Sequence, residues 1–79
     1  MKSYLIDMRA LGDYAFKVLE MIIDRMKEGE MLILFSYKDP SKVLRKMGIR
    51  QKVDIVVKRK ASGEWITYII ARSSRVQNY

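Results

Sequence analysis

An uninterrupted apolar run at residues 31–35 is the feature that most constrains how this chain can fold. The run reads M-L-I-L-F and lies between two polar residues, Glu30 and Ser36. Continuous apolar sequence of this length is typical of a strand with substantial burial, and it is far too short to cross a bilayer. We therefore expect residues 30–37 to form a central strand of a sheet.

The segment before that strand has helical periodicity. Residues 4–8 alternate as a first strand, and Asp13 is a good N-cap for the helix that follows. Gly29 is placed to end this helix in a left-handed conformation. The inner face of the helix is predicted from apolar residues at helical spacing, namely Leu19, Ile22, Ile23 and Met26.

The second half of the chain predicts one more helix and a hairpin. Asp39 and Pro40 supply a capping carboxylate and a proline at the first helical position. Gly48 ends the helix, and its inner face is expected from Val43, Leu44 and Met47. Residues 53–58 and 64–72 alternate as strands, joined by a turn at residues 60–63.

These elements predict an α+β fold, a two-layer α/β sandwich of order βαβαββ. The four strands would form a mixed sheet with both helices on one face, leaving the other face partly open. Seventy-nine residues allow one domain, 1–79, in which the polar residues 73–79 are expected to form a flexible tail. No long apolar stretch follows the N-terminus, so we expect a cytoplasmic protein.

The chain has neither cysteine nor histidine. It therefore lacks the usual ligands of zinc, haem and iron–sulfur centres, and it lacks thiol nucleophiles and histidine general bases. We expect no metal, no cofactor and no catalytic residue, and we place an enzyme built on carboxylates and lysines last among the possible functions.

The net charge of +7 is concentrated in the second half of the chain. Residues 1–37 carry five basic and six acidic side chains, whereas residues 38–79 carry eleven basic and three acidic ones. Such a field attracts polyanions or acidic protein surfaces. The candidate polyanion-binding residues are Arg45, Lys46, Arg50, Lys52, Lys58, Arg59, Lys60 and Arg72, with Tyr37, Trp65 and Tyr68 as possible stacking surfaces.

The run I-D-M-R-A-L-G-D-Y-A-F at residues 6–16 resembles the opening of the TusA/SirA-like sulfur carriers, which reads roughly D-x-R-G-L-x-C-P-x-P. The resemblance continues through M-K-E-G-E-M-L at residues 26–32, K-D-P at 38–40, K-M-G at 46–48 and the final strand at 65–71. It implies the βαβαββ fold predicted above. The second helix is shorter here than is usual in that family.

Asp13 stands where the resemblance places the persulfide-carrying cysteine, with Arg9, Leu11, Gly12 and Tyr14 as its motif neighbours. A carboxylate cannot accept and pass on sulfur, so Asp13 is either a helix cap or a mimic of the charged persulfide. Arg9 matches the family's arginine; it either anchors the loop or pairs with Asp7 or Asp13.

The resemblance thus implies a non-catalytic binding or regulatory module linked to sulfur-relay proteins. Its partner would be a relay protein or a second copy of itself. The alternative is a basic module that binds RNA or DNA; no membrane partner is expected.

Overall fold

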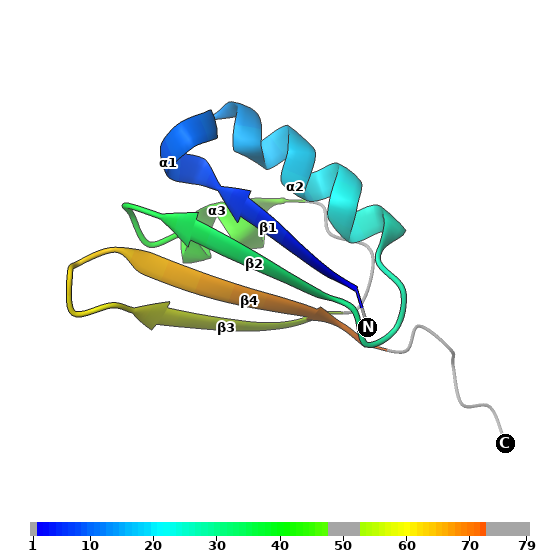
Figure 1. Cartoon of the computed structure of the whole chain (residues 1–79). Helices are drawn as coiled ribbons and strands as arrows, with labels where there is room; N and C mark the ends of the chain where they lie inside the picture. The colour runs from blue at the N-terminus through cyan, green and yellow to red at the C-terminus, as the bar shows by residue number, and fades with distance from the viewer. Residues whose placement is uncertain (1, 48–52, 73–79) are drawn as a thin grey trace, which may run out of the picture.

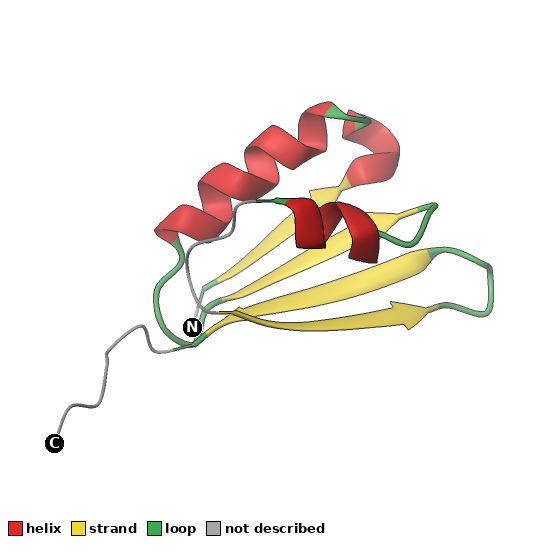
Figure 2. Ribbon diagram, turned by 180° about the vertical axis from the view of Figure 1, so that it is seen from behind, coloured by secondary structure: helices red, strands yellow, loops and turns green. Residues whose placement is uncertain are grey.

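A four-stranded sheet with helices on one face forms the molecule, as Figures 1 and 2 show for the computed structural model. The structure describes residues 2–47 and 53–72. Strands run side by side in the order β1-β2-β4-β3. β1 and β2 are parallel, and β4 is antiparallel to β2 and β3, which makes the sheet mixed. The strands are β1 (Ser3–Asp7), β2 (Met31–Ser36), β3 (Val53–Arg59) and β4 (Trp65–Ala71).

The helices are α1 (Met8–Leu11), α2 (Tyr14–Arg25) and α3 (Ser41–Lys46). The predicted α+β class, the mixed four-stranded sheet and the helices on one face are confirmed. The predicted number of helices is wrong, because the segment after β1 forms two helices instead of one. The break lies at Gly12, whose φ of 59° lies outside the helical region and is easiest for glycine.

Asp7, rather than Asp13, makes the helix-capping hydrogen bond of this segment. Its side chain accepts from the backbone N–H of Arg9 at 3.0 Å. Asp13 precedes α2 but has helical backbone angles and makes no side-chain capping bond. Asp13 therefore stands at the predicted N-cap position of α2, but its side chain makes no capping hydrogen bond, and its helical backbone angles are not those that a cap residue normally adopts.

The ends of the other predicted elements differ in smaller ways. α2 ends at Arg25, so the prediction that Gly29 terminates it is wrong. Gly29 instead lies in a turn with a φ of 85°, and the Gly29 N–H donates to the Ala71 carbonyl at 2.9 Å. Asp39 accepts from the backbone N–H of Ser41 at 2.9 Å, so its carboxylate serves the start of α3 as predicted, but Pro40 is the N-cap residue rather than the first helical residue. Val43, predicted to face inward, is 37% exposed. Gly48 and residues 73–79 lie outside the described residues.

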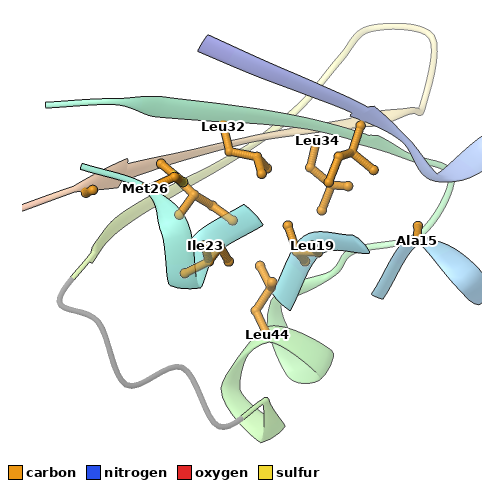
Figure 3. Packing of buried hydrophobic residues seen from close by; sticks show 10 residues of the cluster. Ala15, Leu19, Ile23, Met26, Leu32, Leu34 and Leu44 are labelled. Carbon is orange, nitrogen blue, oxygen red and sulfur yellow. The ribbon is translucent and has the colours of Figure 1, made fainter. Parts of the chain in front are cut away.

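The core lies between the sheet and the helices (Figure 3). Leu32 and Leu34 of β2 point toward Leu19 and Ile23 of α2. Leu44 of α3 belongs to the same buried cluster, on the same face of the sheet. Leu19, Leu32 and Leu34 have no exposed surface. The helical and strand periodicities read from the sequence thus converge on one buried layer.

The predicted hairpin between β3 and β4 is confirmed. The Lys60 N–H donates to the Glu64 carbonyl at 2.7 Å, and the Gly63 N–H donates to the Lys60 carbonyl at 2.9 Å. Gly63 has a φ of 92°, which a residue with a side chain adopts only at a cost. Along β4, Thr67, Ile69 and Ala71 are buried under the helices, so the residues between them lie on the open face.

Candidate functional site

A hollow of about 430 Å³ opens beyond the carboxyl ends of the parallel strands β1 and β2. In open α/β sheets, the loops that follow parallel strands diverge at this edge and leave a crevice between them. One wall comes from the segment after β1, with Met8, Gly12, Asp13 and Phe16. The other wall comes from the segment after β2, with Ser36, Tyr37, Lys38, Asp39, Pro40 and Val43. We refer to it as the Asp13 hollow.

Asp13 is exposed in the wall of this hollow, at the start of α2. Its carboxylate makes no capping bond to that helix, so it stays available to a ligand or partner. The partial positive charge of the helix N-terminus favours an anion at this position. Beside it, Met8 and Phe16 are half-buried and present apolar surface.

The opposite wall is held in shape by its own hydrogen bonds. The Ser36 hydroxyl donates to the Lys38 carbonyl at 2.8 Å, and the Ser41 hydroxyl donates to Asp39 at 2.6 Å. The hydrogen bonds from Ser41 hold the pKa of the Asp39 carboxyl below its ordinary value. Asp39 is therefore an ionised structural group of the loop, and the wall is formed before any partner arrives.

Two large apolar side chains that line the Asp13 hollow are well exposed, and two more lie next to its lining residues in the chain. Tyr37 and Val43 line it, with 68% and 37% of their surface exposed. Leu11 and Tyr14 flank Gly12 and Asp13 in the chain and are 44% and 65% exposed. Several exposed apolar groups around one charged residue are typical of a binding surface.

Arg9 pairs with Asp7, one of the two partners open from the sequence, and also with Glu64, which the sequence did not suggest. Its guanidinium donates to Asp7 at 2.8 and 2.9 Å and to Glu64 at 2.8 Å. It lies 5.4 Å from the centroid of the Phe35 ring. The hydrogen bonds that Arg9 donates to Asp7 and, second in effect, to Glu64 raise the pKa of Arg9, and its bond to Asp7 lowers the pKa of that carboxyl. Arg9 thus anchors the segment that leads to the hollow.

The charged side chains that line the hollow are few. Within residues 2–47 and 53–72, no group of three or more acidic side chains is close enough to hold a metal ion. Asp13, Lys38 and Asp39 remain, and Asp39 is already engaged by Ser41. Of the lining residues, the sequence pointed to Gly12 and Asp13 as motif positions and to Tyr37 as a possible stacking surface. The rest of the hollow could have been found from the rule that parallel strands open a crevice at their carboxyl ends.

The structure divides the predicted polyanion-binding residues into separate groups. Lys58, Arg59 and Lys60 lie together at the hairpin end of β3. Arg72 lies at the other end of the sheet, beside Asp54 at 3.2 Å, because Val53 pairs with Ala71 while Arg59 pairs with Trp65. Arg45 and Lys46 belong to α3, and Arg50 and Lys52 lie outside the described residues.

Two cations of the hairpin end already have neighbours. Arg59 lies 5.8 Å from the centroid of the Trp65 ring. Lys60 lies 3.9 Å from Glu64 and 5.9 Å from the centroid of the Phe35 ring. Of the predicted stacking residues, Tyr37 is exposed beside the Asp13 hollow, whereas Tyr68 is half-buried on the open face of the sheet.

No protein-family model matches the chain, and neither a curated protein nor a solved structure matches it significantly. Among the described helices, none is long and apolar enough to cross a membrane. The resemblance to the TusA/SirA-like carriers therefore rests on the residues quoted for it.

Proposed function

We propose that this protein is a non-catalytic binding module of the TusA/SirA-like kind, which docks a sulfur-relay protein at the Asp13 hollow. One observation carries the proposal. Asp13, which the resemblance aligns with the family's cysteine, lies exposed in the wall of a hollow that is also lined by the exposed side chains of Tyr37 and Val43.

The physical argument combines burial with charge. Closing a partner over Tyr37 and Val43 removes apolar surface from water and supplies the favourable free energy. A carboxylate at Asp13 presents a negative charge where a carrier presents a persulfide anion. A partner that recognises this anion is held, but no sulfur passes, because the chain has no thiol.

Binding to purified relay proteins, a cysteine desulfurase and a downstream sulfur acceptor, tests the proposal by isothermal titration calorimetry. Asp13→Lys should weaken binding at least about tenfold, because the new lysine would face a partner site that recognises an anion. Asp24→Lys is the matched control, because Asp24 is exposed on α2 and makes the same charge change outside the hollow. Equal losses in both variants, or no binding to either relay protein, would contradict the proposal.

A second experiment tests the placement of Asp13. In Asp13→Cys, the N-terminus of α2 should lower the pKa of the new thiol below about 8.5, the ordinary value for cysteine. Alkylation rates measured against pH report this pKa. Leu5→Cys is the control, because Leu5 is 66% exposed in β1. An inert thiol at position 13 would show that the resemblance misplaces the motif.

Nucleic-acid binding at the hairpin end is a second candidate function. The adjacent cations Lys58, Arg59 and Lys60 favour it, since Arg59 lies beside the Trp65 ring and Lys60 beside the Phe35 ring. Anisotropy with labelled single-stranded RNA should then show affinity that falls steeply with salt and falls further on reversal of these charges. Binding that ignores salt would exclude this function.

A further inference from the structure

The face of the sheet opposite the helices is an ordered apolar surface. The register places its residues in three rows across β1, β2, β4 and β3. The central row is Leu5, Ile33, Tyr68 and Val56, all of them apolar or aromatic. The outer rows are Ser3, Met31, Ile70 and Asp54 on one side and Asp7, Phe35, Ile66 and Lys58 on the other. We call these twelve residues the open face.

The middle of the open face has the composition of a covered surface. Met31, Ile33 and Phe35 belong to the continuous apolar run of β2, a pattern usual for strands that are covered on both sides. Here the helices cover only Leu32 and Leu34 of that run (Figures 1 and 3). At the outer strands of the central row, Leu5 is 66% exposed and Val56 is 44% exposed.

The charges of the open face are nearly balanced, although the chain carries +7. Asp7 is paired with Arg9, which also reaches Glu64, and Asp54 is paired with Arg72. Of the three charged residues of the open face, Lys58 is the one that makes no ion pair within the described part of the chain. A surface with this balance does not attract a polyanion or an anionic membrane; it suits an apolar protein face.

We propose that the open face binds a second copy of this chain, sheet against sheet, in a two-fold symmetric dimer. A two-fold axis parallel to the strands places Lys58 opposite Asp7 of the other copy, and Leu5 opposite Val56. An axis perpendicular to the strands, in the plane of the sheet, places Lys58 opposite Asp54 and repeats the central row on itself. In either arrangement the unpaired cation meets a carboxylate twice, so the surface complements itself.

The size of the open face sets the strength of the dimer. Four strands about 4.8 Å apart and five residues of about 3.3 Å each give a footprint of roughly 320 Å² per copy. Twice this area is below the roughly 1,200 Å² that stable specific interfaces bury, so the dimer should be weak and transient. The Asp13 hollow faces the loops on the helix side and stays accessible, so this proposal stands apart from the proposed function.

Sedimentation velocity from 10 µM to 1 mM tests the dimer. The mass of the native protein should rise from 9.3 kDa toward twice that value. Leu5→Lys and Val56→Lys should remain at the monomer mass, and their circular dichroism should match the native spectrum because both side chains are already exposed. Met21→Lys is the matched control; Met21 is 55% exposed on α2, so this variant adds the same charge away from the open face and should dimerise normally.

A native mass that stays at 9.3 kDa up to 1 mM, or a Met21→Lys variant as monomeric as Leu5→Lys, would overturn the proposal. Charge reversal tests the complementarity of the two open faces. Lys58→Asp should lower the association constant about tenfold. Lys17→Asp, at an exposed position of α2, should leave the association constant within about twofold of the native value. Equal association constants in these two variants would refute the pairing of Lys58. Binding of RNA or of anionic vesicles that Leu5→Lys and Val56→Lys abolish, in a protein that stays monomeric, would assign the face to that partner instead.

Discussion

The Arg9 guanidinium and the Glu64 carboxylate, 55 positions apart in the chain, form an ion pair at 2.8 Å. The pair joins α1 to the turn that precedes β4, and Arg9 also holds Asp7 at the end of β1. Because Phe35 of β2 lies under the same guanidinium, Arg9 connects the ends of three strands at one edge of the sheet.

The connection predicts coupling between Arg9 and Glu64. Arg9→Met and Glu64→Gln should each lower the melting temperature, and the double variant should lower it by less than their sum, because both remove one interaction. Thermal unfolding of the four proteins of this double-mutant cycle measures the coupling. Strictly additive losses would show that the pair contributes nothing to stability.

The lowered pKa of Asp7 predicts a loss of stability in acid. Its hydrogen bond from Arg9 holds the pKa below its ordinary value of 3.8. The stability that the carboxylate contributes is therefore present above this ordinary value and lost as pH falls through the lowered pKa. Urea unfolding between pH 2 and 6 should show a shallower acid dependence in Asp7→Asn than in the native protein. Parallel curves would contradict the assignment.

Leu19→Ala should destabilise the fold by about 2–5 kcal/mol, because Leu19 is fully buried between α2 and the sheet. A domain of this size has only a few kcal/mol of stability, so the variant should be largely unfolded. Leu5→Ala makes the same chemical change at an exposed site and should cost less than about 0.5 kcal/mol. Urea denaturation compares the two at low protein concentration, and similar losses would show that the core is placed wrongly.

Thr67 is fully buried, and its hydroxyl oxygen has no hydrogen-bond partner within the described residues. Thr67→Val removes this unsatisfied group with little change of shape and should stabilise the protein by about 1 kcal/mol. Ser36→Ala should instead cost about 1 kcal/mol, because the Ser36 hydroxyl donates to the Lys38 carbonyl. Denaturation curves should move in opposite directions; a destabilised Thr67→Val would show that the hydroxyl has a partner after all.

Asp13→Ala and Asp39→Ala should separate a binding carboxylate from a structural one. Asp13 makes no capping bond, so its removal should change stability by less than about 0.5 kcal/mol. Asp39 accepts two hydrogen bonds from Ser41, so Asp39→Ala should lower the melting temperature more. The reverse order in thermal unfolding would make Asp13 the structural group.

Local patterns were enough to predict the mixed sheet, the hairpin and the alternation of β4. Thr67, Ile69 and Ala71 alternate with half-exposed residues, and Gly63 marks the turn. The composition also determined that this chain cannot carry a persulfide on cysteine, because it has no cysteine. These features depend on residue type and on spacing within one element, which the sequence displays directly.

Tertiary structure alone decided the features that join distant segments. It brought Glu64 to Arg9. It also gave the side-chain capping hydrogen bond to Asp7 rather than to Asp13, because Gly12 divides the first helical segment into two helices. It also left one side of the apolar run in β2 uncovered, since α2 and α3 both pack on the other face. An apolar run shows that a strand favours burial on both sides; only the packing of the helices determines which side the chain covers itself.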